Sequence, residues 1–256
     1  NPRVVNPHDD MKGSYLGPEF TQKEIEAELI KNGAKFEILS DDEIIDKTSS
    51  DLSLGEAVGW FQGRMEFGPW ALGARSILGD PRSSKMQKNL NLKVKFRESF
   101  RPFAPSVLKE DLNEWFDINV DSPYMLMVAN INDKKIIEMT EEQKALFGIE
   151  KLNVKRSDIP AVTHVDYSAR IQTVLKETNE KYFKLITKFK EKTGCPVLVN
   201  TSFNVRGEPI VNTPSDAFNC FMGTELDRLI IGNCYLVKEE QDSSLKKDYK
   251  KEFELD

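Results

Sequence analysis

The strongest constraint on the fold comes from a helix that leads directly into a short apolar strand. Residues 180–194 (EKYFKLITKFKEKTG) have the pattern of an amphipathic helix, with Asn179 as the expected N-cap and Gly194 as the expected stop. The apolar stripe consists of Phe183, Ile186 and Phe189. Residues 195–200 (CPVLVN) predict a short buried strand. Such a stripe has to be buried against another layer, which indicates a sheet covered by helices.

Helices and strands are mixed along the rest of the chain without regular βαβ repeats. Thr21 and Glu24 form a predicted capping box for a helix that ends at Gly33. Further helices are expected within 41–56, weakly at 140–148, and at 214–223 behind the cap Thr213. Strands are expected at 35–39, 58–62 and 92–97, in the segment 161–175, and at 228–237. The mixture predicts a mixed sheet flanked by helices, in the α/β or α+β class.

The composition is that of an ordinary globular protein. A chain of 256 residues, 39% hydrophobic and 30% charged, can bury a core as one large domain or as one domain with an appendage. It has no membrane-length apolar run and no signal peptide, so a cytoplasmic protein is expected. Cys195, Cys220 and Cys234 lie in or beside apolar runs, which predicts buried thiols and no metal site. The start at Asn1 suggests a fragment, a processed chain or a trimmed one.

Positive charge is concentrated in one part of an acidic chain. Between Trp60 and Glu110 there are ten basic and four acidic residues, so this segment carries +6 within a chain of net charge −6. The net acidity makes nucleic-acid binding an unlikely general role. A basic segment within an acidic protein instead indicates an anionic ligand that is bound at one place.

The main candidates for binding that anion lie around residues 92–97 (LKVKFR). If this segment is a strand, Lys93, Lys95 and Arg97 share one face, and Arg101 follows four residues after Arg97. Guanidinium forks and ammonium point charges together suit a polyphosphate or an acyl phosphate. The alternative is a solvated strand face that binds nothing.

Three other stretches could contribute to a site. Residues 63–78 (GRMEFGPWALGARSIL) form a glycine-rich loop that could hold a ligand through its backbone or serve as a structural turn. The predicted strand before Asn200 opens onto a loop with Ser202, which could bind a ligand or only satisfy its own backbone. His164 and Asp166 are expected on one strand face, as a polar site or as structural residues.

Four long motifs follow one another through the chain. They are residues 59–82 (GWFQGRMEFGPWALGARSILGDPR), 90–108 (LNLKVKFRESFRPFAPSVL), 159–174 (IPAVTHVDYSARIQTV) and 193–218 (TGCPVLVNTSFNVRGEPIVNTPSDAF). Together they resemble the C-terminal domain of the NodU/CmcH-type O-carbamoyltransferases. The likeness spans roughly Val58 to Gly232, and four motifs in the right order make it specific.

The resemblance implies one half of a two-part enzyme. The N-terminal half would be Kae1-like, carry Fe²⁺ and transfer the carbamoyl group to a hydroxyl acceptor. The C-terminal half would be a YrdC-like twisted sheet in which carbamoyl phosphate and ATP, with Mg²⁺, form carbamoyl-adenylate and release pyrophosphate. Residues 1–45 would then be a linker and the tail of the preceding domain, 46–238 the YrdC-like domain, and 239–256 a charged tail. The other half would belong to the same full-length chain or to a partner chain, and a homodimer is conceivable.

The resemblance also assigns the site residues. Lys95, Arg97 and Arg101 match the basic motif and would act as catalytic cations on the phosphates. The other ligand-binding residues would be Arg170, Asn200, Ser202, Arg75 and Trp70. The family usually reads GPRALG where this chain has Trp70, so Trp70 would stack on adenine or fill the pocket. Two alternatives are a nucleotide-binding module without turnover and a YrdC-like RNA-binding domain.

Overall fold

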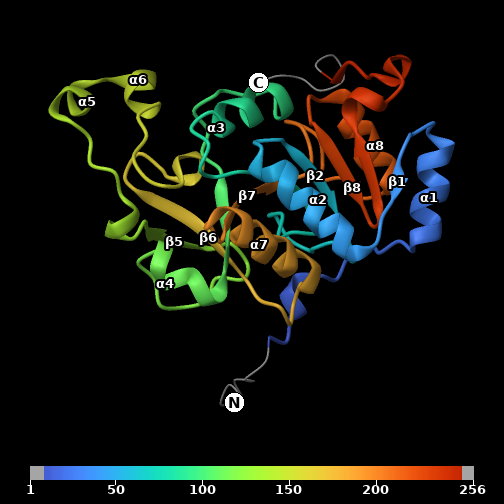
Figure 1. The fold of residues 1–256 in the computed structure, drawn as a ribbon, viewed down its shortest axis with the longest axis horizontal. Coiled ribbons are helices and arrows are strands. Elements are labelled where there is room, and N and C mark those ends of the chain that lie inside the picture. The colour runs from blue at the N-terminus through green and yellow to red at the C-terminus, as the bar shows by residue number, and fades with distance from the viewer. Residues whose placement is uncertain (1–8, 250–256) are drawn as a thin grey trace.

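A computed structural model describes residues 9–249 as a nine-stranded mixed sheet flanked by helices (Figure 1). The strands are β1 Glu37–Ile38, β2 Val58–Phe61, β3 Arg75–Gly79, β4 Ala104–Leu108, β5 Met127–Asn130, β6 Ser168–Val174, β7 Val197–Ser202, β8 Arg228–Ile231 and β9 Cys234–Val237. The helices are α1 Gln22–Lys31, α2 Asp41–Ser53, α3 Met86–Asn89, α4 Leu112–Trp115, α5 Glu141–Ala145, α6 Gly148–Leu152, α7 Glu180–Thr193 and α8 Pro214–Gly223. The predicted fold class is confirmed.

The sheet order places the strands that carry the motifs side by side. The order is β1-β9-β8-β2-β3-β7-β4-β6-β5, with β2 parallel to β8, β4 parallel to β6, and every other pair antiparallel. Strands β3, β7, β4 and β6 are therefore neighbours, although 100 residues of sequence separate some of them. β1 precedes residue 46 and joins this sheet, whereas the domain boundaries after residues 45 and 238 stay predictions.

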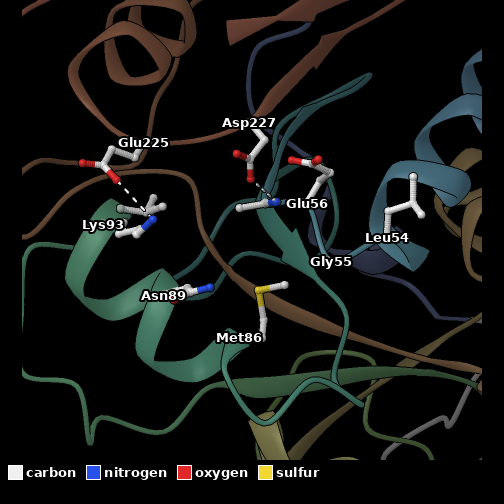
Figure 2. Close-up of a pocket in the computed structure, with 10 residues that line it drawn as sticks. Leu54, Gly55, Glu56, Met86, Asn89, Lys93, Glu225 and Asp227 are labelled. Carbon is white, nitrogen blue, oxygen red and sulfur yellow. Dashed lines mark hydrogen bonds and ion pairs between the residues drawn. The ribbon is translucent and has the colours of Figure 1, made fainter. Parts of the chain in front are cut away.

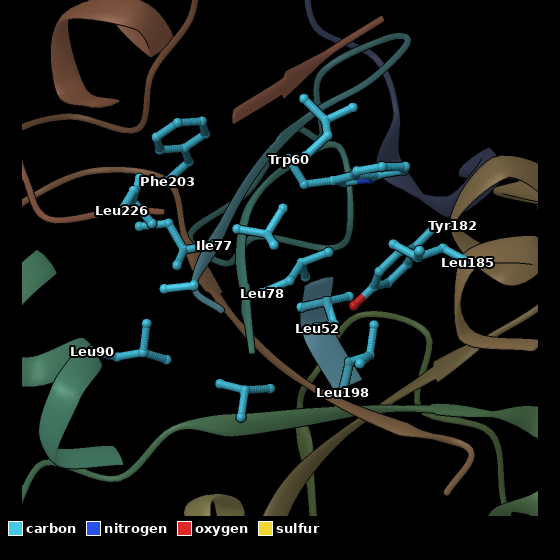
Figure 3. Close-up of a cluster of buried hydrophobic side chains, with 14 of the residues drawn as sticks. Leu52, Trp60, Ile77, Leu78, Leu90, Tyr182, Leu185, Leu198, Phe203 and Leu226 are labelled. Atoms are coloured by element: carbon cyan, nitrogen blue, oxygen red, sulfur yellow. The ribbon is translucent and has the colours of Figure 1, made fainter. Parts of the chain in front are cut away.

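The core lies on both faces of the central strands. Figure 3 shows Leu52 of α2 and Tyr182 of α7 beside Leu78, whereas Ile77 points to the side of Phe203. All five side chains are fully buried. Adjacent residues on a strand alternate between its faces, so β3 is covered on both sides. This buried position gives the loop before β3 a rigid base.

Local signals set most helix ends where the sequence predicts them. Thr21 and Thr213 both form capping boxes, at the starts of α1 and α8. Asn179 caps α7, and Gly194 ends it with a φ of 76°. These features depend on neighbours three or four residues away, which is why the sequence alone reveals them.

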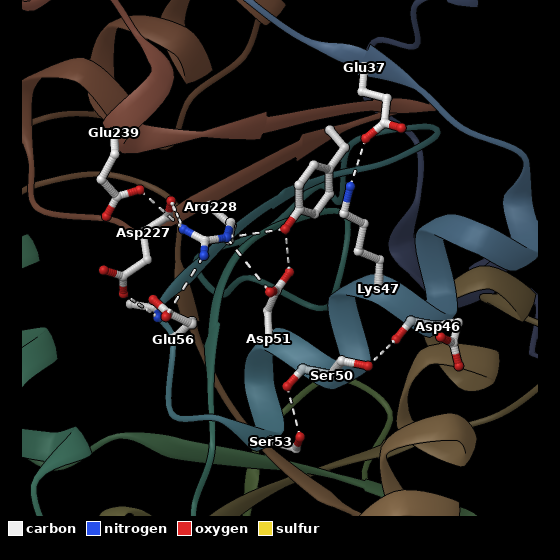
Figure 4. Close-up of polar contacts among 12 residues, drawn as sticks. Glu37, Asp46, Lys47, Ser50, Asp51, Ser53, Glu56, Asp227, Arg228 and Glu239 are labelled. Carbon is white, nitrogen blue, oxygen red and sulfur yellow. Dashed lines mark hydrogen bonds and ion pairs between the residues drawn. The ribbon is translucent and has the colours of Figure 1, made fainter.

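A polar cluster links α2 to strands β8 and β9 of the sheet (Figure 4). The Tyr235 hydroxyl donates to Asp51 at 2.7 Å and accepts from Arg228 Nε at 3.1 Å. Arg228 also lies 3.8 Å from Glu56 in an ion pair. Its cation is thus shared among carboxylates, and this arginine is a structural one.

The predicted strand at 92–97 is wrong. Helix α3 continues into a π-helical turn over Leu90–Val94. Met86, Leu90 and Val94 are buried at four-residue spacing, while Leu92 is 46% exposed. Their packing into the core outweighs the two-residue alternation that suggested a strand.

Two other strand predictions need correction. The segment 228–237 is a hairpin of β8 and β9, because Gly232 has a φ of 55° and turns the chain together with Asn233. In the segment 161–175 the strand begins only at Ser168, after a short 3₁₀ helix that Pro160 starts. His164 therefore lies in a turn and does not share a strand face with Asp166.

The C-terminal segment is packed more closely than its charge suggests. Gln241 is 8% exposed and exchanges hydrogen bonds with the backbone of Lys35, and Tyr249 is 5% exposed. The expectation of a solvated tail is wrong at these positions, and residues 250–256 lie outside the described residues. No helix within residues 9–249 is both long and apolar enough to cross a membrane.

Candidate anion-binding site

The glycine-rich loop between β2 and β3 folds around one buried carboxylate. Glu66 is 2% exposed. Its Oε1 accepts hydrogen bonds from the backbone N–H groups of Leu72, Ala74 and Arg75 at 2.5, 3.2 and 3.3 Å. Gly73, between them, has a φ of 101°, a conformation that favours glycine. The carboxylate thus holds the loop in one shape through three convergent donors.

Arg75 fastens the same loop and does not face a cavity. Its guanidinium is fully buried, with Cζ 3.5 Å from the centroid of the Phe61 ring. It donates hydrogen bonds of 3.0–3.3 Å to the carbonyl oxygens of Pro18, Gln62, Gly63 and Ala74. Burial lowers the pKa of Arg75 to about 10. Its terminal nitrogens are used on the backbone, and its Nε is buried without a partner among residues 9–249, so Arg75 is placed as a structural residue.

Trp70, the bulky side chain of this loop, lies against another arginine, Arg170. The Cζ atom of Arg170, on β6, is 3.5 Å from the centroid of the Trp70 ring. Trp70 also packs against a small apolar cluster that is separate from the main core. The cluster consists of Leu72, Ala104 and Met125. The tryptophan is therefore the aromatic partner of a cation on β6.

Trp70 and Arg170 line a cavity of about 140 Å³ between the glycine-rich loop, the segment before β4, and the end of β7. The cavity brings together five of the residues that the sequence assigns to the site. They are Trp70, Arg97, Arg170, Asn200 and Ser202. Two guanidinium groups, a hydroxyl and an amide in so small a space suit an anion of phosphate size.

Arg97 reaches the cavity from the chain after the π-helical turn. Its Nε donates to Asn91 Oδ1 at 2.7 Å, and its Cζ is 5.0 Å from the ring centroid of Phe103. Burial, followed by the nearby Arg101, lowers the pKa of Arg97 to about 10. A partly buried cation whose hydrogen-bond partner is a neutral amide is stabilised when an anion arrives.

Arg170 is the less satisfied of the two cations in the cavity. Its Nε is buried without a hydrogen-bond partner among residues 9–249, and one terminal nitrogen lies 4.0 Å from Met125 Sδ. Burial lowers the pKa of Arg170. A buried donor without a partner is costly, so a ligand that accepted a hydrogen bond from Arg170 would lower this cost.

Arg101 lies outside the cavity. Its side chain is 43% exposed, and its Nε is 3.0 Å from Glu98 Oε2 in an ion pair. Glu98 also lies 3.7 Å from Arg206. The structure thus pairs Arg101 with a carboxylate, and Arg101 is not among the residues that line the cavity.

Lys95 lies behind the cavity wall, 3% exposed. Its Nζ donates to the Ser202 carbonyl, to Asn204 Oδ1 at 2.7 Å and to the Asn204 carbonyl at 2.9 Å. Burial, followed by the nearby Arg97, lowers the pKa of Lys95 to about 7, whereas these oxygens favour the protonated amine. Lys95 therefore fixes the turn that carries Ser202, and its amine does not line the cavity.

Asn200 adds a buried amide to the cavity wall. It is 1% exposed, and its Nδ2 lies 2.8 Å from Gln172 Oε1 and 3.0 Å from Ser106 Oγ. Its Oδ1 is buried without a hydrogen-bond partner in the described part of the chain. An unsatisfied acceptor next to two arginines indicates that a ligand N–H can be bound here as well.

Left-handed backbone conformations occur around this cavity. Phe96 precedes Arg97 with a φ of 49°, and Met125 lines the cavity with a φ of 54°. Tyr167 has a φ of 64° in the turn before β6. Such conformations cost about 1–3 kcal/mol each and tend to occur at functional sites.

A second cavity, of about 200 Å³, has the opposite chemistry (Figure 2). Glu56, Asp227 and Glu225 line it, and Lys93 lies 3.6 Å from Glu225 in an ion pair. Burial raises the pKa of Glu56, and the nearby Asp227 adds to the effect. Carboxylates here would repel a phosphate, so this cavity does not compete for the same ligand.

His164 lines a third and larger cavity, of about 570 Å³, together with Phe100 and Asp166. Its Nδ1 is 3.2 Å from Ser168 Oγ, and burial lowers its pKa. Pro102 belongs to the walls of both this cavity and the one at Trp70. The larger cavity therefore adjoins the anion-binding one.

Three residues of the site escaped the sequence reasoning. Glu66 is an acid within a glycine-rich loop, a signal that could have suggested a loop anchor. Gln172, 2% exposed, donates to the Leu72 carbonyl at 2.8 Å and thereby links β6 to the loop. Met125 lies in a segment without any local signal. The three cysteines are buried, and residues 9–249 contain no cluster of three or more His, Cys, Asp or Glu side chains that could hold a metal ion.

Comparison with known proteins identifies the family. Residues 49–238 match the carbamoyltransferase C-terminus family, and the chain belongs to it. An uncharacterized protein of Synechocystis, sll1178, is 54% identical over all of this chain and 42% of its own length. The nodulation protein NolNO of Sinorhizobium fredii is 40% identical over 91% of this chain and 32% of its own. The family predicted from the motifs is confirmed.

A relative that is named for its reaction extends the comparison. The 3′-hydroxymethylcephem-O-carbamoyltransferase of Streptomyces clavuligerus is 35% identical over 73% of this chain and 32% of its own length. The chain thus spans less than half of the length of these relatives. Among solved structures, HypF of T. kodakarensis matches with a TM-score of 0.42 and 14% identity, over 65% of this chain and 18% of its own.

Proposed function

We propose that this chain is the module of an O-carbamoyltransferase that binds ATP and carbamoyl phosphate and forms carbamoyl-adenylate. The observation that carries the proposal is the cavity in which Arg97 and Arg170 converge and Arg170 Nε has no partner among the described residues. Family membership supports carbamoyl transfer in general. The adenylate step rests on the resemblance and on the charge of this cavity.

The proposed reaction joins the carbamoyl group to AMP. Water takes up the phosphoryl group of carbamoyl phosphate, so the bond between that phosphorus and the carbamoyl oxygen breaks and inorganic phosphate leaves. The carbamoyl oxygen bonds to the α-phosphorus of ATP, and the bond between the α-phosphorus and the oxygen of the leaving pyrophosphate breaks. Arg97 and Arg170 would stabilise the charge that develops on the phosphoryl oxygens.

Two groups of the wall would orient the small substrate. Asn200 Oδ1, buried and without a partner in the described chain, would accept a hydrogen bond from the carbamoyl amide. Ser202 would be the second orienting group. Its Oγ donates to Asn204 Oδ1 at 2.8 Å, and Lys95 holds this turn in place. Mg²⁺ would be held by the phosphates of ATP.

Size suggests how ATP would lie. A cavity of about 140 Å³ can take a phosphate or a carbamoyl group, whereas pockets for larger ligands usually measure about 300–1,000 Å³. The nucleoside part of ATP would therefore extend beyond this cavity.

Transfer to the hydroxyl acceptor would follow on a Kae1-like half with Fe²⁺, in the same full-length chain or in a partner chain.

The test is carbamoyl-phosphate-dependent exchange of labelled pyrophosphate into ATP. Arg97→Ala and Arg101→Ala make a matched pair, since both arginines lie in one short segment and only Arg97 lines the cavity. We expect Arg97→Ala to abolish exchange and Arg101→Ala to retain most of it. Equal loss in both variants would place Arg101 on the ligand as well. Exchange that persists without carbamoyl phosphate, or in Arg97→Ala, contradicts the proposal.

A further inference from the structure

Trp70 has two kinds of neighbour. It packs against the small apolar cluster of Leu72, Ala104 and Met125. The Cζ of Arg170 lies 3.5 Å from the centroid of its ring. The indole is therefore supported by apolar contacts and carries a guanidinium group over its ring.

Few other contacts hold the Arg170 guanidinium in place. Its Nε has no hydrogen-bond partner within residues 9–249, and the one hydrogen-bond contact of its terminal nitrogens is with Met125 Sδ at 4.0 Å. The side chain is long and would lose rotamer freedom on ordering. The ring face compensates part of this loss, since a cation over tryptophan is attracted by the π-electrons of the ring.

Stacking on a ring leaves the hydrogen-bonding capacity of arginine intact. The five N–H donors of a guanidinium group lie in its plane and point outward, whereas the ring contacts the flat face. Arg170 can therefore stack on Trp70 and still present a donor fork to the cavity. This differs from Arg75, whose terminal nitrogens are used on carbonyl oxygens although it stacks on Phe61 at the same 3.5 Å.

We infer that Trp70 is a positioning residue, whose ring face holds the Arg170 guanidinium so that its N–H edge meets a phosphate-class oxyanion in the cavity. Trp70 itself neither stacks on the ligand nor blocks the cavity. The inference rests on the proposed function in one respect, namely that the ligand is an oxyanion. It assigns to Trp70 a role that an arginine at this position would fill differently, by adding a third cation beside Arg97 and Arg170.

The test is calorimetric titration of the full chain with inorganic pyrophosphate. Trp70→Leu removes the π-face and keeps an apolar side chain, so the dissociation constant should rise about 5- to 30-fold, the equivalent of a lost cation–π contact. Trp70→Phe keeps a ring and should bind within about 3-fold of the parent. Urea unfolding midpoints of both variants should match the parent, since Trp70 lies outside the main core.

A second readout needs no ligand. In ¹H–¹⁵N spectra the Arg170 Nε–H resonance should show an upfield ring-current shift in the parent chain and in Trp70→Phe, and lose it in Trp70→Leu. Equal pyrophosphate affinity in all three proteins would overturn the positioning role and leave the anion site standing. Absence of pyrophosphate binding in the parent chain would overturn the anion site and, with it, this inference.

Discussion

Arg75 and Arg170 stack on aromatic rings at the same distance and serve different purposes. Each Cζ lies 3.5 Å from a ring centroid, over Phe61 and Trp70 respectively. The terminal nitrogens of Arg75 donate to backbone carbonyls, whereas those of Arg170 contact Met125 Sδ at 4.0 Å within the described chain. The Nε atoms of both arginines are buried without a partner among the described residues. Residue type and aromatic contact therefore do not distinguish the two arginines, whereas the hydrogen bonds of their terminal nitrogens do.

The comparison extends to the other cations of the basic segment. Lys95 is buried among the oxygens of one turn, Arg101 is paired with Glu98, and Arg97 faces the cavity. A segment that looks uniformly basic therefore divides into a buried structural cation, an exposed ion-paired cation and a cavity-lining cation. Each of the following changes tests that division.

Arg75→Ala should have the largest effect on stability. It leaves buried carbonyl oxygens without donors and removes the contact with Phe61, so we expect a loss of roughly 3–5 kcal/mol in the free energy of unfolding. Urea denaturation followed by circular dichroism measures this loss. A change below about 1 kcal/mol would show that the loop does not depend on Arg75.

Arg170→Ala should separate binding from stability. It removes charge-assisted hydrogen bonds to the anion, worth about 1.5–3 kcal/mol, so pyrophosphate affinity should fall about 10- to 100-fold while the unfolding free energy changes little. Arg64→Ala is the control, since Arg64 is half exposed and pairs with Glu19 at 3.2 Å. Comparable affinity in the Arg170 and Arg64 variants would remove Arg170 from the site.

Glu66→Gln should loosen the glycine-rich loop. The amide keeps the shape but loses the charge that strengthens three hydrogen bonds, so we expect a loss of about 1–2 kcal/mol in unfolding free energy. Glu19→Gln, at an exposed ion pair, should cost less than about 0.5 kcal/mol. If both substitutions cost the same, the buried carboxylate has no special role in the loop.

Lys95→Met should change how stability depends on pH. The pKa of Lys95 is lowered to about 7, whereas an unfolded lysine titrates near about 10.4. Between these values the unfolded chain binds more protons, so this group makes stability rise with pH from about 7 to 10. Unfolding free energies measured across this range should rise less steeply in Lys95→Met. An unchanged slope would mean that the pKa of Lys95 is close to its ordinary value.

The sequence predicts what depends on near neighbours. The caps at Thr21, Asn179 and Thr213 follow from spacings of three or four residues, and all three are confirmed. The predicted stripe of α7 is confirmed at Ile186 and Phe189, whereas Phe183 is only partly buried. The strand prediction at 92–97 is wrong because apolar residues there fit both the two-residue alternation of a strand and the spacing of a helix. Burial of Leu90 and Val94 against the rest of the core decides between the two, and that information lies elsewhere in the chain.

The candidate site was predictable as a set of residues and not as a geometry. The motifs pointed to Arg97, Arg170 and Asn200, which meet at one cavity although they belong to distant parts of the chain. No local pattern indicated that Arg75 would be used on carbonyl oxygens. The role of each cation depends on the groups that surround it, and the order of the strands brings these groups together from distant parts of the chain.

The most direct test of the division is a crystal structure of the chain with pyrophosphate bound. We predict phosphate oxygens within hydrogen-bonding distance of Arg97 and Arg170, the indole of Trp70 still stacked on Arg170, and the contacts of Arg75 with backbone carbonyls unchanged. Pyrophosphate bound beside Arg101 or in the cavity at His164, with the space between Arg97 and Arg170 empty, would contradict the account.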